Sequence, residues 1–158
     1  PLFVEGDVLT EKQGPYSSLR LTLCLTGNRN QRVVASRGVG YLPGVRIRKE
    51  SGQVTCVGTL YVSGDWLLES GKVESAESTI VLCNGNLRLA AGTMEFKNLG
   101  FNTAGNVRVE GTVNVTGDLL VEAVNDLSGG KILVRGAIKK PARGVKGTTQ
   151  ILQAGSSK

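Results

Sequence analysis

A glycine-punctuated repeat of about twenty residues dominates the middle of this chain and constrains its fold more than any other feature. Three copies of its corner unit are Gly64-Asp65-Trp66, Gly85-Asn86-Leu87 and Gly105-Asn106-Val107, at steps of 21 and 20 residues. Each unit leads into alternating apolar and polar residues, as in Asn106-Val107-Arg108-Val109. A period of two is typical of a strand with one buried face. A constant step between such strands is typical of a solenoid.

The apolar pairs of the repeat fall into three columns, in which successive pairs lie 19 to 21 residues apart. The first column holds Val45 and Ile47, Trp66 and Leu68, Leu87 and Leu89, and Val107 and Val109. The second holds Val73, Met94 and Phe96, Val113 and Val115, and Ile132 and Val134. The third holds Leu60 and Val62, Ile80 and Leu82, Leu99 and Phe101, Leu119 and Val121, and Ile138. Three strands per repeat predict an all-β, single-domain, three-sided parallel β-helix with about 20 residues per coil.

An antiparallel β-sandwich is the alternative fold, because its strands would also alternate and would also be separated by glycine-rich turns. The constant spacing favours the solenoid. Left-handed hexapeptide solenoids are expected to have roughly eighteen residues per coil, so the longer step here favours the right-handed form. A chain with 4% aromatic residues and 22 glycines suits a narrow aliphatic interior with many corners.

The repeat divides the chain into three parts. Residues 44–138 are expected to form the regular solenoid. Residues 1–43 are expected to form irregular first coils and an N-terminal cap, because the open end of a stack exposes apolar side chains and unpaired backbone groups. Residues 139–158 no longer follow the pattern and are expected to form a basic flexible tail.

Polar residues follow the corner glycines. Asp65, Asn86 and Asn106 are predicted to stack on one another and to satisfy backbone groups of the turns. The neighbouring Trp66 is expected to be a core residue and not a surface platform for sugars.

Charge is distributed unevenly along the chain, whose formal net charge is +6. The net charge is +4 over residues 1–50, −5 over residues 51–130 and +7 over residues 131–158. Such basic ends are suited to contact an anionic polymer, a membrane surface or the acidic middle of another copy. The candidate contact residues of the C-terminal end are Lys139, Lys140, Arg143 and Lys146. Further candidates form an outward basic row between the apolar pairs of the first column, namely Arg46, Arg88 and Arg108. The alternative is that all of them are ordinary solvated surface residues.

The chain contains no histidine, which excludes Ser-His-Asp and Cys-His nucleophilic sites and the HExxH zinc site. Cys24, Cys56 and Cys83 lie 32 and 27 residues apart, a spacing that matches neither a CxxC pair nor a zinc ribbon. We interpret them as small buried hydrophobic residues in a reducing compartment. Glu74 and Glu95 are carboxylates on adjacent predicted coils, but the loops are too short to build a groove around them. We therefore predict no enzymatic activity, no cofactor, no metal site and no small-molecule substrate.

The stretch from Gly105 to Ile138, which reads GNVRVEGTVNVTGDLLVEAVNDLSGGKILVRGAI, resembles the core of the bactofilins. The resemblance extends over residues 44–138. It implies a small cytoplasmic right-handed β-helix that polymerises end to end and attaches to membranes. The stretch is also similar to the repeats of filamentous-haemagglutinin-type adhesins, which are exported solenoids.

We expect a structural, cytoskeleton-like protein that forms homo-oligomers or filaments through the strand edges of its terminal coils. The predicted edge residues are Leu21, Leu23 and Val33 at one end and Ile132, Val134 and Ile138 at the other. The alternative is a rigid binding, adhesion or viral structural module that contacts an anionic polymer or a host surface through its basic ends. The expected location is the cytoplasm, or outside the cell or on a virion if Pro1 is a processed terminus.

Overall fold

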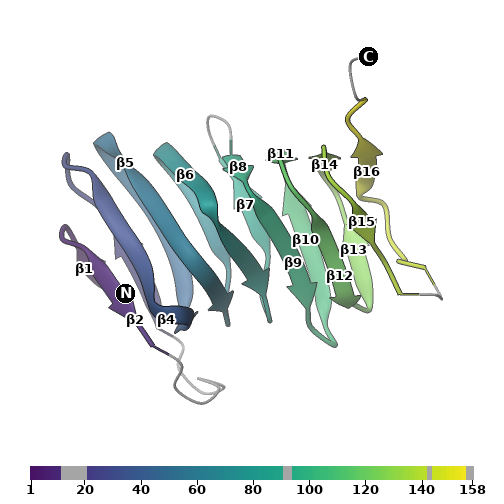
Figure 1. The fold of residues 1–158 in the computed structure, drawn as a ribbon, viewed down its shortest axis with the longest axis horizontal. Coiled ribbons are helices and arrows are strands. Elements are labelled where there is room, and N and C mark those ends of the chain that lie inside the picture. The colour runs from purple at the N-terminus through teal and green to yellow at the C-terminus, as the bar shows by residue number, and fades with distance from the viewer. Residues whose placement is uncertain (12–20, 91–93, 142–143, 156–158) are drawn as a thin grey trace.

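The computed structural model describes residues 1–11, 21–90, 94–141 and 144–155. Figure 1 shows a stack of coils that begins with β1 and β2 at one end and finishes with β15 and β16 at the other. The described residues form strands and no helix, in about 7 turns of roughly 20 residues each. Every strand pairing between them is parallel. The fold is therefore the predicted parallel β-solenoid, and parallel pairing excludes the antiparallel sandwich.

Three ladders of hydrogen-bonded strands form the sides of the solenoid. Three long strands turn the corners between sides, namely β4 (Gln31–Leu42), β5 (Gly44–Val62) and β6 (Trp66–Leu82). Side 1 also contains β1 (Leu2–Val4), β3 (Thr22–Leu25), β7 (Leu87–Leu89), β10 (Asn106–Glu110) and β13 (Asp126–Ser128). Side 2 also contains β2 (Val8–Thr10), β8 (Met94–Phe96), β11 (Thr112–Val115), β14 (Lys131–Val134) and β16 (Gln150–Gln153). Side 3 also contains β9 (Asn98–Asn102), β12 (Leu119–Ala123) and β15 (Ile138–Lys139).

The register confirms the predicted third column and the second column from Met94 onward. Successive register partners on side 3 are Leu60, Ile80, Leu99, Leu119 and Ile138. On side 2 they are Met94, Val113, Ile132 and Ile151. Apolar side chains from successive coils therefore lie directly above one another, which removes each of them from water.

The first column is confirmed as far as Leu87, but its next step differs from the prediction. Leu87 pairs with Val109, 22 residues later, instead of Val107. Val107 pairs with Leu127 of the following coil. Because side chains alternate with a period of two, a shift of two residues keeps the same side chains on the inward face. All four of these residues are buried.

The interior contains large side chains in its middle coils. Trp66, Phe96 and Phe101 are the largest of the fully buried residues. The rings of Trp66 and Phe96 pack edge to face, with centroids 5.8 Å apart. Trp66 is therefore a core residue, as predicted, and its Nε1–H has no acceptor among the described residues.

Strand pairing extends beyond the predicted limits of residues 44 and 138. β1 and β2 form a first coil that pairs with β3 and β4. At the other end, β16 pairs with β14 along Gln150–Gln153, inside the segment expected to be a flexible tail. These outer strands have only three or four residues. Alternation over so few residues gives little signal in the sequence, and the neighbouring coil supplies the hydrogen bonds that order them.

Polar side chains link successive coils at the corners. Asp65 Oδ1 accepts the backbone N–H of Asn86 at 2.7 Å, and Asn86 Oδ1 accepts that of Arg108 at 2.9 Å. Asn106 Oδ1 accepts a hydrogen bond from the side-chain amide of Asn125 at 2.7 Å. The predicted corner stack is therefore confirmed for Asp65 and Asn86. It is wrong for Asn106, because the 22-residue step between these two coils places Arg108 beside Asn86 instead.

A second corner stack was not predicted from the sequence. Asn98 Oδ1 accepts the backbone N–H of Asp118 at 2.8 Å, and Asp118 Oδ1 accepts that of Ala137 at 2.9 Å. The steps of 20 and 19 residues match the repeat. The polar residues Thr79, Asn98 and Asp118 directly before Ile80, Leu99 and Leu119 were the signal that could have revealed this stack.

Substitution of Gly85 would test how closely the corners of successive coils approach one another. Its φ is +82°, and a Cβ there would lie only 2.5 Å from the backbone nitrogen of Asp65. Gly38 is a matched control, because its φ is +80° and no other described residue places an atom within 4 Å of the Cβ position. We expect Gly38→Ala to lower the free energy of unfolding by about 1 kcal/mol through backbone strain. Gly85→Ala should lower it by about 1–3 kcal/mol more, because rigid backbone must move. Urea denaturation measures both losses, and equal losses would contradict the stacking.

Candidate assembly surfaces at the two ends

The N-terminal end of the stack exposes two edge strands. β1 pairs only with β3 and β2 only with β4, so within the described residues the outer edge of each strand has no partner. Leu2 is 52% exposed, Phe3 67% and Leu9 71%. Leu2 and Leu9 also line an apolar hollow of about 220 Å³, together with Leu21 and Tyr41. We call β1, β2 and Leu21 the N-terminal surface.

The C-terminal end exposes the last strand of side 2 and a segment of side 1. β16 pairs only with β14 among the described residues. The backbone N–H of Leu127 donates to the carbonyl of Lys146 at 2.9 Å, and that of Thr149 donates to the carbonyl of Leu127 at 3.1 Å. Residues 146–149 therefore continue side 1 beyond β13. We call residues 146–149 and β16 the C-terminal surface.

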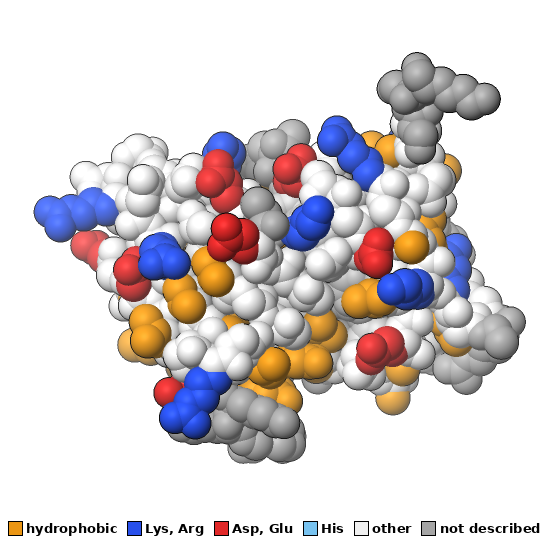
Figure 2. Space-filling view, viewed as in Figure 1, with side chains coloured by type: hydrophobic (Ala, Val, Ile, Leu, Met, Phe, Trp, Pro, Cys, Tyr) orange, Lys and Arg blue, Asp and Glu red, His pale blue; other side chains and the backbone are white. Residues whose placement is uncertain are grey.

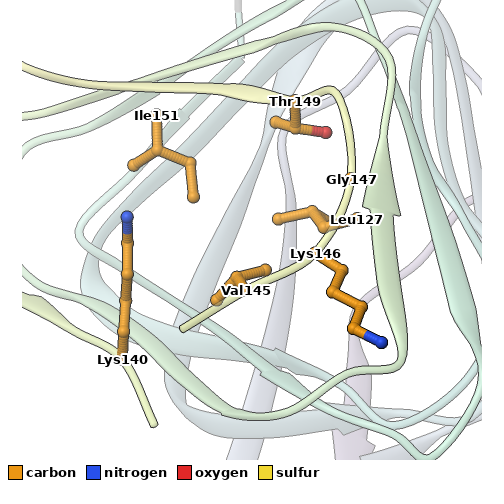
Figure 3. A pocket seen from close by; sticks show the side chains of 7 residues that line it. All are labelled: Leu127, Lys140, Val145, Lys146, Gly147, Thr149 and Ile151. Atoms are coloured by element: carbon orange, nitrogen blue, oxygen red, sulfur yellow. The ribbon is translucent and has the colours of Figure 1, made fainter. Parts of the chain in front are cut away.

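The interior of the last coil is partly empty. A hollow of about 190 Å³ lies between Leu127, Val145 and Ile151. In Figure 3 the Lys140 side chain reaches toward Ile151, whereas Lys146 points away from it. The hollow at the open end of the interior therefore has a mixed lining, in which Lys140, Lys146 and Thr149 stand beside the three aliphatic side chains.

Near each end, an inward glutamine binds the carbonyls of a corner. Gln153 Nε2 donates to Val134 O at 3.1 Å and to Gly136 O at 2.9 Å. Gln31 Nε2 donates to Val4 O at 2.9 Å and to Gly6 O at 2.8 Å. These amides supply a donor to Gly6 O and Gly136 O, and a second donor to Val4 O and Val134 O, which also accept the backbone N–H groups of Thr26 and Ala154.

A buried lysine accompanies the N-terminal glutamine. Lys49 is 2% exposed, and its Nζ donates to Gln31 Oε1 at 2.6 Å and to Thr26 O at 2.9 Å. Burial lowers the pKa of Lys49, and the carboxylate of Glu5 partly opposes that shift. Sequence reasoning missed this residue, although Lys49 continues the inward alternation of Val45 and Ile47.

The structure places most of the predicted edge residues one coil inside the ends. Leu21 is exposed and Ile138 is half-buried on the last strand of side 3. The other four residues are covered by a further strand, because β1, β2 and β16 lie outside them on sides 1 and 2. The covered residues are Leu23, Val33, Ile132 and Val134.

The three outward arginines each lie beside a carboxylate. Arg46 Nε is 3.5 Å from Glu69, Arg88 Nε is 2.9 Å from Glu110 and Arg108 Nε is 3.3 Å from Glu110. The hydrogen bond from Arg88 lowers the pKa of Glu110. Figure 2 shows one face of the stack, where acidic and basic side chains are interspersed. This pairing favours an ordinary solvated surface over a track for a polyanion.

The C-terminal lysines differ in their partners. Lys139 Nζ is 3.3 Å from Asp118. The backbone N–H of Ala137 and the ammonium of Lys139 together lower the pKa of Asp118. Lys140 and Lys146 are exposed, and no carboxylate of the described residues lies within 4.0 Å of either ammonium. Arg143 lies outside the described residues.

Glu74 is bound by two neighbours. It accepts hydrogen bonds from Lys72 Nζ at 2.6 Å and from Gln53 Nε2 at 2.8 Å. The bond from Lys72 lowers the pKa of Glu74. A general acid needs a raised pKa, so Glu74 is not poised for that role, and Glu95 is an exposed residue of β8.

The cysteines differ in burial. Cys24 and Cys56 are buried as expected, and burial raises the pKa of Cys56 to about 12. Cys83 is only half-buried, and partial burial raises its pKa as well, with the charge of Glu122 adding to the shift. Cys56 therefore remains a protonated, unreactive thiol near neutral pH.

No helix in the described part of the chain is long and apolar enough to cross a membrane. Within the same residues, no group of three or more Cys, Asp or Glu is arranged to hold a metal ion. Comparison of the chain with known protein families, with curated proteins and with solved structures found no match. We therefore infer function from the geometry of the two ends.

Lys49 should make the stability of the fold depend on alkaline pH. Its folded-state pKa is lower than the ordinary value of 10.5, so the unfolded chain binds more protons at pH values between the two. The free energy of unfolding should therefore rise with pH in that range. We expect wild type to gain stability relative to Lys49→Met as the pH rises toward the ordinary lysine pKa of 10.5, measured by urea denaturation. Lys97→Met removes an exposed lysine and is the control. A constant gap between wild type and Lys49→Met would refute the assignment.

Proposed function

We propose that this protein is a non-enzymatic structural solenoid that self-associates through its terminal coils into filaments or oligomers. One observation carries the proposal: among the described residues, every large hydrophobic side chain that is exposed lies at an end of the stack. Leu2, Phe3, Leu9 and Leu21 lie at the N-terminal surface, and Leu152 lies on β16. Exposed apolar groups beside unpaired strand edges are typical of surfaces that bind another chain.

The sides of the solenoid offer much less to a partner. Their strands have neighbours above and below, and their corner residues are bonded to the next coil. The outward arginines are paired with carboxylates. The resemblance of Gly105 to Ile138 to bactofilins supports the same proposal, because those proteins polymerise end to end.

The proposal predicts association that depends on apolar residues at the N-terminal surface. We expect the purified chain to form elongated particles whose length increases with concentration, as seen by sedimentation velocity and negative-stain electron microscopy. Phe3→Ser combined with Leu9→Ser should weaken association by roughly tenfold or more, because two large apolar side chains no longer leave water on contact.

The matched control is Leu67→Ser combined with Leu120→Ser, which changes two half-buried outward leucines on the sides of the stack. This variant should associate like wild type. Short rods of constant length at every concentration would refute self-association, and equal losses in both double variants would refute the role of the end.

A second candidate function is contact with an anionic polymer through the C-terminal end. The observation that favours it is the pair Lys140 and Lys146, which lines the open hollow and has no carboxylate within 4.0 Å among the described residues. Residues 131–158 contain no acidic residue at all. Unpaired cations on one end produce a local positive potential that attracts polyanions.

Double-stranded DNA is a suitable polyanion probe for this second candidate. Lys140→Gln combined with Lys146→Gln should reduce the slope of log affinity against log salt by about two, because each lost phosphate contact removes roughly one released counterion. Arg46→Gln combined with Arg88→Gln should leave the slope nearly unchanged, since both arginines are already paired. If DNA affinity is the same for wild type and the lysine variant, the C-terminal end is not the contact.

A further inference from the structure

We propose that copies of this chain stack head to tail, so that the N-terminal surface of one copy continues the last coil at the C-terminal surface of another. This inference rests on the proposed self-association and adds its polarity and register. The partner is a second copy of the same chain. Three features of the two ends support the head-to-tail arrangement: their strands, their apolar groups and their charges.

The two ends offer strands on the same two sides. The N-terminal surface has β1 on side 1 and β2 on side 2, and the C-terminal surface has residues 146–149 on side 1 and β16 on side 2. In Figure 1 these elements lie at opposite ends of the stack. Head-to-tail contact would add β1 and β2 as parallel strands to both ladders. Every pairing between the described strands is also parallel, so the junction would repeat the contact between coils.

The inward positions of the two ends are complementary. Ile151 is the register partner of Ile132, and Val8 is the register partner of Val33, so both occupy inward positions of side 2. Each lines a hollow, of about 190 Å³ at the C-terminal end and about 220 Å³ at the N-terminal end. Placing Val8 over Ile151 would cover both hollows with the opposite end of another copy.

The outward positions of side 2 are also aliphatic at both ends. Leu152 lies beside Leu133, and Leu9 lies beside Val34. Between the ends, the same outward row contains Glu95 and Asn114, which suit contact with water. A head-to-tail junction would place Leu9 next to Leu152 and would bury two of the most exposed leucines of the described chain.

The charged side chains in the described parts of the first and last coils are opposite in sign. Residues 1–11 include Glu5, Asp7 and Glu11 and no lysine or arginine. The last described coil, by contrast, contains only basic residues among its charged groups: Lys131, Arg135, Lys139, Lys140 and Lys146. Head-to-tail contact brings these opposite charges together, which steers association and selects the orientation.

Contact between like ends lacks these features. Two C-terminal surfaces would bring lysines against lysines, and two N-terminal surfaces would bring carboxylates against carboxylates. A two-fold axis would also make the strands at the junction antiparallel. Head-to-tail contact is heterologous and does not close on itself, so it predicts an open filament with two different ends.

Cysteine cross-linking tests the polarity directly. Leu9→Cys and Leu152→Cys are made separately in a Cys83→Ser background, in which Cys24 and Cys56 stay buried. A short bismaleimide is then added to each protein alone and to an equal mixture. We expect a 9-to-152 cross-link in the mixture, identified by mass spectrometry, and at least tenfold less dimer in either protein alone. Leu67→Cys on the side of the stack is the control and should give no dimer.

The outcomes separate this inference from the proposed function. Cross-links that join position 9 to 9 or 152 to 152 would overturn the head-to-tail polarity while self-association stands. Association without a cross-link at either position would overturn the stacking at the junction. A chain that stays monomeric in sedimentation at every concentration would overturn both.

Charge reversal gives an independent readout of the same contact. Lys140→Glu with Lys146→Glu, and separately Glu5→Lys with Glu11→Lys, should each weaken association by about tenfold or more, because each variant has like charges at both ends. An equal mixture should recover near wild-type association. Variants that each associate like wild type would show that charge does not select the partner and would overturn that part of the inference.

Discussion

Parallel stacking of one coil on the next is the interaction on which the rest of this structure depends. A single coil encloses too few side chains to form a core, so its inward residues are buried only when neighbouring coils cover them. The line of Leu60, Ile80, Leu99, Leu119 and Ile138 shows how one side chain per coil builds a continuous apolar ladder. The same stacking requires small residues at corners, where the backbones of successive coils approach closely, as Gly85 shows.

A stack of this kind can always accept another coil, so its first and last coils each lack a neighbour on their outer side. Near both ends, an inward glutamine binds corner carbonyls, through Gln31 in one case and Gln153 in the other. Within the described residues neither end is covered, since apolar side chains remain exposed beside strands that have a partner on one side only. In the described parts of the two end coils, the charged side chains are acidic in the first coil and basic in the last, which makes the ends unlike each other. Unlike ends favour addition of copies in one direction over a closed pair.

Much of the fold could be predicted from the sequence, because inward residues recur with two clear periods, two along a strand and about twenty between coils. The signal failed where strands were short, as in β1, β2 and β16, so the predicted edges such as Val33 and Ile132 lay one coil too far inside. The sequence pattern also did not reveal which charged side chains form ion pairs between coils. Arg88 looked like part of a basic row, but Glu110 of the next coil lies 2.9 Å from it. The burial of Lys49 was missed because a lysine is rarely placed on an inward face.

The sequence by itself determined the parallel solenoid, the length of its coils and the aliphatic residues that fill it, because these depend on periodicity that is visible along one chain. Only the tertiary structure decided which residues form the two ends and which charges remain without a partner. It also set the offset that pairs Leu87 with Val109. The physical reason is that each outward side chain meets its neighbours from coils about twenty residues away. Small differences in coil length therefore change those contacts without disturbing the alternation that keeps the core buried.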